Sequence, residues 1–465
     1  MTVDHRQPRA TNVTPDLAAA SHAELLRRGA ERLRRDDPTL SRLLDHEVAY
    51  QSHTLPMVAH ASLADPSVLS AAGSALANVT AEGYPGARFH PGAAQFDAVE
   101  RLAVHRAERA FGAQYANLQP HSCSSANLAV LFTLLEPGDV VLSLDLDSGG
   151  HLTHGAPASV TGRYFRVINY GLDPDGWISH DQAAELAREH RPKLIIAGAS
   201  AYPRTIDYVR FREIADSVGA YLLADVSHIA GLVAVGLHPS PVDVAHVTTT
   251  STYKQLGGPR GGIILLGQDR STPVRTHGTS LEKLMKRSVF PRFQGTPSPA
   301  AIAAKARALD LVTQPEFAGT VGRIATNATR LAAALMARDW RVLTGGTDNH
   351  MVLLDTWKRG ITGAVAESAL QECGILANKN RIPGDSKPPL ITSGLRLGTN
   401  ILAQRGLRPA EMDSCAALVD QVLRGVEVLG DKEYRLANNT RDRVRTRVQE
   451  LCRRYPIPSY QTGYG

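Results

Sequence analysis

The chain has 465 residues, of which 43% are hydrophobic and 21% are charged, and its net charge is +6. This length exceeds the size at which one hydrophobic core usually stops growing, so we expect two domains. The composition is ordinary for a soluble enzyme, and no stretch approaches about eighteen uninterrupted apolar residues, which excludes a transmembrane helix.

The basic residues are scattered along the chain. The densest basic run, RRGAERLRRDD at 27–37, is interleaved with acids and a leucine, which favours a solvated helix face over a nucleic-acid-binding patch. None of the four cysteines forms a CxxC pair, so neither a zinc site nor a redox motif is supported. The N-terminus has no apolar signal core, and we expect a cytoplasmic protein without membrane or nucleic-acid partners.

Helical and strand patterns alternate along the first two thirds of the chain. A polar arm at 1–16 precedes a helix predicted around 17–47. Strands are predicted at 139–145, 193–198, 221–226, 245–252 and 261–267. Helices lie between them, and two of these helices end at Gly112 and Gly219. Short buried strands separated by helices indicate a mostly parallel α/β sheet with helices on both faces.

The pattern changes after a loop-like stretch around 275–300. A long helix over 321–335 is followed by strands at 340–346 and 351–357, a helix at 363–373, a strand at 394–400 and a helix over 415–426. The chain ends in a helix and a proline-containing extended tail. This second part predicts a smaller α+β unit.

Polar residues at predicted strand ends are the first candidates for chemistry, because ligands of open α/β sheets lie at the carboxyl ends of the strands. Asp225 ends one apolar strand, His228 follows it, and Lys254 ends the next strand. Asp225 alone is also consistent with a helix N-cap. An acid and a lysine on neighbouring strand ends suit pyridoxal phosphate, because the lysine forms a Schiff base and the carboxylate keeps the ring nitrogen protonated.

Two further segments are consistent with this cofactor. Ser122 and Ser124 precede an apolar helix and would form a phosphate cradle at its N-terminus, although a serine-rich N-terminus taken alone is more often a simple cap. His151 and His154 lie in a glycine-rich loop without an acidic or cysteine partner at metal-ligand spacing, so we predict no metal. A flat imidazole that stacks on a flat cofactor is the better interpretation.

The chain resembles the serine hydroxymethyltransferase family in segments that cover about 55–430 in order. They are TAEGYPGARFHPG, YANLQPHSCSSAN, GGHLTHG, LLADVSHIAGLVAVGLHPSP, VTTTSTYKQLGGPRGG, GGTDNHMVLLD and ITSGLRLGTN. The resemblance implies a fold-type-I pyridoxal phosphate-dependent transferase with a seven-stranded sheet. The implied domains are an N-terminal arm and helix (1–50), a large cofactor-binding domain (51–300) and a small C-terminal domain with an extended tail (301–465).

The resemblance also implies roles for individual residues. Lys254 would carry the cofactor, Asp225 would contact its ring nitrogen, and His151 would stack on its ring. The remaining implied cofactor contacts are His228 and Ser200 near the ring hydroxyl, Ser122, Cys123 and Ser124 at the phosphate, and Gly295 lent by a second subunit of a homodimer or tetramer.

On the substrate side, the resemblance assigns Arg396 to the carboxylate, which a guanidinium binds with two parallel hydrogen bonds. Glu82 matches the glutamate that moves protons at the substrate hydroxyl and contacts folate. The implied catalytic set is Lys254, Glu82, His228 and Asp225.

The sequence departs from the family pattern around the expected substrate. His60 replaces a serine, Thr80 and His90 replace tyrosines, and Tyr253 replaces a histidine. Neutral drift is one explanation, but the changes cluster where substrate would bind, so we expect a changed second substrate. The favoured hypothesis is a threonine transaldolase of the fluorothreonine- or glycyl-nucleoside-forming kind. Such an enzyme cleaves L-threonine or L-serine to a glycine quinonoid and adds that unit to another aldehyde.

The alternative is tetrahydrofolate-dependent serine hydroxymethyl transfer, because several positions on the folate side match the family: Glu82, Leu146, Gly150 and Asn380. A catalytically inactive relative is disfavoured by the retention of Lys254, Asp225 and Arg396. An aminotransferase or decarboxylase of the same fold type would not be expected to keep TAEGYPG and GGHLTHG.

Overall fold

The structure is a computed structural model that describes residues 20–274 and 278–461, and the chain divides into two compact units at His46. The N-terminal unit contains α1 (His22–Asp36) and the start of α2 (Pro38–His53). The single helix predicted over 17–47 is therefore wrong, because Pro38 disfavours helical geometry at Asp37 and begins a second helix. The basic run lies mostly on α1, where Arg27 and Arg28 pair with Glu24 one turn away.

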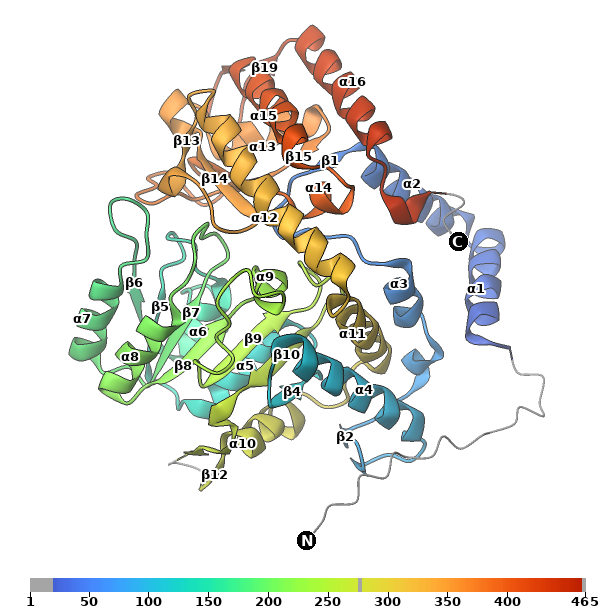
Figure 1. Cartoon of the computed structure of the whole chain (residues 1–465), viewed down its shortest axis with the longest axis vertical. Coiled ribbons are helices and arrows are strands. Elements are labelled where there is room, and N and C mark those ends of the chain that lie inside the picture. Colours follow the sequence, from blue (N-terminus) through green and yellow to red (C-terminus); the bar gives the residue numbers. More distant parts are fainter. Residues whose placement is uncertain (1–19, 275–277, 462–465) are drawn as a thin grey trace. The chain divides into compact units, whose positions relative to one another are not determined.

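From Glu47 onward, the central element is a seven-stranded sheet with the order β4-β10-β9-β8-β7-β5-β6 (Figure 1). The strands are β4 (Tyr115–Asn117), β5 (Val140–Leu144), β6 (Arg166–Tyr170), β7 (Leu194–Gly198), β8 (Tyr221–Asp225), β9 (Val247–Ser251) and β10 (Gly262–Leu266). Strand β10 is antiparallel to both its neighbours, and the other pairings are parallel. The predicted mostly parallel α/β sheet is confirmed.

Both faces of this sheet are buried, and alternate residues of each strand pack into the hydrophobic cores on opposite faces. Ile195 and Leu222 face one core, and Ile196 and Leu223 face the other. The first face packs against α4 (Ala94–Phe111), α7 (His180–His190), α8 (Tyr208–Val218) and α11 (Pro299–Val312). The second face packs against α5 (Cys123–Leu134) and α10 (Leu281–Arg287).

The helix α10 falls within the stretch around 275–300 that was predicted to be loop-like. Its N-cap is Ser280, and Leu281, Leu284 and Met285 are buried against the sheet, so tertiary packing stabilises a short helix there. Residues 275–277 lie outside the described residues.

A second core surrounds a four-stranded antiparallel sheet with the order β13-β14-β17-β16. Its strands are β13 (Arg341–Val342), β14 (Met351–Asp355), β16 (Asn378–Asn380) and β17 (Gly394–Gly398). The helices around it are α12 (Pro315–Met336), α13 (Gly363–Glu372), α15 (Pro409–Arg424) and α16 (Asn438–Arg454). The strand predicted at 340–346 shrinks to two residues because Thr344 has a φ of 57°, which no strand tolerates.

The long helix α12 links the two cores. Val321 belongs to the core of the seven-stranded sheet, and Leu331 and Leu335 belong to the second core. The predicted domain boundary near 300 stays a prediction. In residues 20–274 and 278–461, no helix has the length and apolar character needed to cross a bilayer.

Candidate active site

The carboxyl ends of the central strands bring one set of polar side chains together. Strand β7 ends before Ser200, β8 ends at Asp225, and β9 ends three residues before Lys254. These strands are parallel, so their ends meet at one edge of the sheet. Nine predicted residues line a single pocket there: Ser122, Cys123, Ser124, His151, Ser200, Asp225, His228, Tyr253 and Lys254.

Asp225 is buried and held by donors. His154 Nε2 lies 3.1 Å from Asp225 Oδ2, Asn127 Nδ2 donates to the same oxygen at 2.8 Å, and the Ser227 amide donates to Oδ1 at 3.0 Å. Burial alone would raise the pKa of this carboxyl, but its hydrogen bonds and its electrostatic interactions with His154 and His151 hold the pKa below the usual range. Asp225 is therefore a carboxylate that stays ionised inside the protein.

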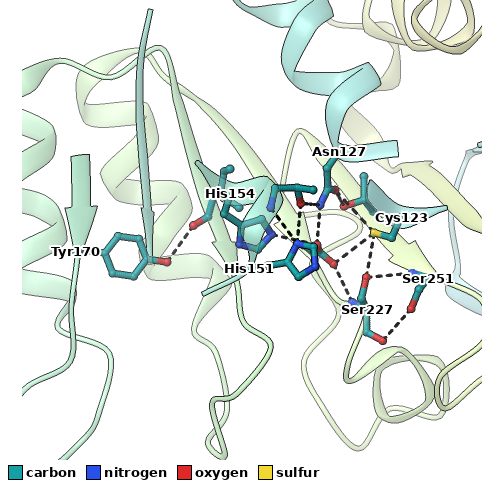
Figure 2. Close-up of polar contacts among 11 residues, drawn as sticks. Cys123, Asn127, His151, His154, Tyr170, Ser227 and Ser251 are labelled. Carbon is teal, nitrogen blue, oxygen red and sulfur yellow. Dashed lines mark hydrogen bonds and ion pairs between the residues drawn. The ribbon is translucent and has the colours of Figure 1, made fainter. Parts of the chain in front are cut away.

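Cys123 completes the surroundings of this carboxylate (Figure 2). Its Sγ accepts a hydrogen bond from Ser227 Oγ at 3.0 Å and lies 3.7 Å from Asp225 Oδ1. Burial raises the pKa of the thiol, so Cys123 stays neutral. We interpret it as a wall of the pocket.

Lys254 is 7% exposed, and in the described part of the chain its side-chain amine forms no ion pair or hydrogen bond. Burial and the charges of Arg396 and Arg260 lower its pKa to about 8, against the opposing effect of Asp225. Its Nζ lies 5.9 Å from the ring centroid of Tyr253, which also stacks beneath Arg260 at 4.2 Å. A buried lysine with lowered basicity is suited to attack a carbonyl carbon.

Two pocket histidines are neutral. Burial lowers the pKa of His151 to about 4, and its Nδ1 accepts from the Thr153 amide at 3.2 Å. Burial, together with the charges of Lys254 and Arg396, holds the pKa of His228 well below its usual value. The Nδ1 atom of His228 is buried without a partner among the described residues. A polar group of a bound molecule would satisfy it.

A helix N-terminus borders the same pocket. Ser122 is the N-cap of α5, and its side chain accepts from the Ser125 amide at 3.0 Å. The free amides and the dipole of this helix favour an anion. Gly262 of β10 makes the close packing possible, because a Cβ there would collide with the carbonyl of Ser122 and lie 2.9 Å from the Cys123 nitrogen.

Arg396 of β17 lies beside this pocket rather than in its lining. It is 7% exposed and donates to the Ser200 carbonyl, to Asn378 Oδ1 at 3.2 Å and to His60 Nδ1 at 3.1 Å. None of these partners is an acid, and burial lowers the pKa of Arg396 to about 10. A buried guanidinium without a counter-charge is a binding place for a carboxylate.

Four predicted site residues lie outside the Lys254 pocket: Thr80, Glu82, His90 and Gly295. Glu82 Oε2 is 3.7 Å from His90 Nε2, and a Cβ on Gly295 would lie 2.9 Å from Glu82 Oε1. Thr80 is exposed two residues before Glu82. Glu82, His90 and Gly295 form a small cluster, and none of the four residues lines the Lys254 pocket.

A doubly covered α/β sheet with a buried lysine and an ionised carboxylate on adjacent strand ends defines a pyridoxal phosphate-dependent enzyme. The serine hydroxymethyltransferase family model matches residues 33–419. Two curated relatives, from Synechococcus sp. and Alkalilimnicola ehrlichii, are each named serine hydroxymethyltransferase and are 46% identical to this chain. They cover 90% and 92% of it, and 96% and 97% of their own lengths.

The chain therefore belongs to the serine hydroxymethyltransferase family, whose members are transferases that use pyridoxal phosphate and act on small amino acids. The residues present fit this cofactor. The unpartnered Nδ1 of His228, the amides at the start of α5, the carboxylate of Asp225 and the amine of Lys254 are the groups that a hydroxylated, phosphorylated pyridine aldehyde requires.

The lowered pKa of Lys254 leads to a testable pH dependence. Only the neutral amine attacks an aldehyde, and with a pKa of about 8 roughly one lysine in ten is neutral at pH 7. We expect the rate constant for binding of pyridoxal phosphate to the apoprotein to rise about tenfold per pH unit up to about pH 8 and then to level off. Stopped-flow absorbance from pH 6 to pH 10 measures it, with Nα-acetyl-lysine as the reference amine. A rate constant that still rises above pH 8, as it would for a lysine with the ordinary pKa of 10.5, would contradict the lowered pKa.

Two groups of this site, Asn127 and His350, were not predicted to be functional. Asn127 binds Asp225 directly, and so does His154, which the sequence suggests only as one of two histidines near the cofactor. His350 is fully buried and stacks on His228 with ring centroids 6.0 Å apart. Asn127 had one usable signal in the sequence, since it is an amide on the otherwise apolar helix that follows the predicted phosphate turn.

Proposed function

We propose that this protein transfers an aldehyde-derived unit to and from glycine by aldol chemistry on a β-hydroxy-α-amino acid. The leading candidate is tetrahydrofolate-dependent serine hydroxymethyl transfer, because relatives with that name share 46% identity over nearly their whole length. The proposal rests on two buried cations, Lys254 and Arg396, neither of which forms an ion pair with any residue in 20–274 or 278–461. A cofactor aldehyde and an amino acid carboxylate are the groups that match them.

Each residue has a distinct task in this proposal. Pyridoxal phosphate, when bound, accepts the electron pair released at the α carbon of the amino acid. Asp225 holds a proton at the ring nitrogen because its own pKa is kept low. Arg396 binds and orients the substrate carboxylate with its planar fork of N–H donors. Lys254, with a pKa of about 8, releases and accepts protons near neutral pH.

A second candidate, threonine transaldolase, is favoured by His60. Burial and the charges of Arg396 and Lys254 lower its pKa to about 4, so its ring is neutral. Its Nδ1 accepts from Arg396 Nη2 at 3.1 Å, which leaves its proton on Nε2. This arrangement supplies a flat donor where the family resemblance places a small serine hydroxyl, and such a change beside the carboxylate-binding arginine supports a changed second substrate.

The two candidates differ in their co-substrate. For hydroxymethyl transfer, we expect L-serine turnover to rise at least about tenfold with tetrahydrofolate, and L-threonine to release acetaldehyde at a rate that added aldehydes do not change. Coupled assays of glycine and acetaldehyde measure both reactions, with His60→Ser as the matched variant. If acceptor aldehydes stimulate acetaldehyde release in folate-free buffer and His60→Ser removes that stimulation, the transaldolase reading replaces the leading one.

We further infer a homodimer or tetramer with shared active sites. Glu82, His90 and Gly295 gather away from the pocket of their own chain. The neighbouring Phe89 is 72% exposed. These residues are therefore placed to complete the site of a second copy.

A further inference from the structure

Lys305 is a buried cation that the proposed chemistry does not use. It lies on α11, its side chain is 2% exposed, and it does not line the cofactor pocket. Its Nζ donates to the carbonyl oxygens of Leu118 at 2.6 Å, Pro120 at 3.0 Å and Gly262 at 3.0 Å. Within the described residues it forms no ion pair, and these three backbone carbonyls are its only hydrogen-bond partners.

Burying an ammonium group costs free energy, because the charge loses its hydration. Burial lowers the pKa of Lys305 to about 7, which measures how strongly the interior disfavours its charge. An apolar side chain of similar length would pack there without that penalty. The three carbonyls match the three N–H donors of an ammonium, so the site is built for the charged form.

Two of the three carbonyls that Lys305 binds, those of Leu118 and Pro120, belong to the turn that enters α5, and the third is on Gly262 of β10. Gln294 Nε2 donates to the Gln119 carbonyl at 2.8 Å, so all three consecutive carbonyls from Leu118 to Pro120 are bound by side chains. Immediately after this turn, Ser122, Cys123 and Ser124 line the pocket. The position of the first amides of α5 therefore depends on what fixes residues 118–120.

Space for the ammonium is provided by a glycine. A Cβ on Gly261 would collide with Lys305 Cε and lie 2.7 Å from Nζ. Any side chain at Gly261 would push the ammonium away from its carbonyls, so the sequence offers a second, independent way to disturb this contact.

We propose that Lys305 is a positioning residue for the cofactor phosphate: it fixes the 118–122 turn and places a positive charge behind the α5 amides. The proposal rests on the assignment of the phosphate to this turn, which is part of the proposed function. A phosphate dianion gains from both effects, because aligned amides bind it and a nearby buried cation is weakly screened.

The test compares pyridoxal 5′-phosphate with pyridoxal, which lacks the phosphate. We expect Lys305→Met to weaken binding of the phosphorylated cofactor to the apoprotein by about 10- to 100-fold, and binding of pyridoxal by less than about threefold. Absorbance titration gives both dissociation constants. We expect Gly261→Ala to reproduce the selective loss, and Lys305→Arg to regain part of the affinity.

Leu309→Ala is the matched control, since Leu309 is buried on the same helix and lies in the core. It should lower the melting temperature and leave the ratio of the two dissociation constants unchanged. Inorganic phosphate gives a readout that needs no cofactor: it should raise the melting temperature of wild-type apoprotein and not that of Lys305→Met. Equal losses for both ligands in Lys305→Met and Gly261→Ala would overturn the role of Lys305. Wild-type protein that binds the two ligands equally would instead overturn the phosphate assignment.

Discussion

Replacing Lys254 by alanine is expected to abolish covalent attachment of pyridoxal phosphate and to lower turnover by at least about 10³-fold. Lys254 is the buried amine at the end of β9, and its pKa of about 8 leaves it reactive near neutral pH. Visible absorption of the purified protein reports the attachment. Borohydride reduction followed by peptide mapping should place the label on Lys254 in the wild-type protein and on no residue in the variant.

Lys283→Ala serves as the control, because Lys283 is exposed on α10 and touches no part of the pocket. It should retain both colour and activity. A Lys254→Ala protein that still carried a reducible label, or that kept more than a few per cent of the activity, would show that another amine does this chemistry.

The same variant tests whether active sites are shared between subunits. Glu82→Gln and Lys254→Ala should each be inactive alone. If Glu82 serves the neighbouring pocket, mixed oligomers regain activity, because one of their sites has both native residues. No regain in mixed oligomers whose composition is verified by native mass spectrometry would contradict shared sites.

Asp225→Asn is expected to lower the rate of the chemical step by about 10²- to 10³-fold while the cofactor still binds. The amide has nearly the shape of the carboxylate but cannot hold a proton at the ring nitrogen. It also leaves His154 Nε2, now 3.1 Å from a carboxylate oxygen, beside a neutral group. Single-turnover kinetics with saturating cofactor isolates the chemical step from cofactor binding.

A cofactor analogue methylated at the ring nitrogen carries a permanent positive charge. It distinguishes an electrostatic role of Asp225 at the ring nitrogen from a role in packing. It should restore part of the rate in Asp225→Asn, because the fixed charge replaces the proton that Asp225 holds. A variant that the analogue fails to rescue, together with an unchanged melting temperature, would mean that Asp225 acts in another way.

Much of the central sheet was predictable, because its interior strands are short apolar runs bounded by helices. β7 and β8 are buried along their whole length or nearly so, and such runs stand out in a sequence. β6 was missed because it is an edge strand with exposed residues among its five, and β4 because it has only three residues. Tertiary pairing, rather than local pattern, makes these two segments strands.

The pocket residues could be named from the sequence because a family motif marks each of them and most also lie near a predicted strand end or helix start. The residues that hydrogen-bond to these pocket residues could not be named from the sequence. The bond from Asn127 to Asp225 joins residues 98 positions apart, and that from His154 to Asp225 joins residues 71 positions apart. Lys305 was missed for the same reason, since its acceptors lie more than 40 positions away along the chain. Long-range hydrogen bonds leave no periodic trace in a sequence.

The contact between Arg396 and the Ser200 carbonyl joins the two sheets, since β17 belongs to the four-stranded sheet and Ser200 follows β7 of the seven-stranded one. Asp225 and Lys254 both belong to the seven-stranded sheet. Local opening of the second core would carry the guanidinium away and leave the lysine and carboxylate in place. If Arg396 binds the substrate carboxylate as proposed, recognition of the substrate depends on the contact between the two sheets, and ligand occupancy at Arg396 would add to the free energy that keeps them together.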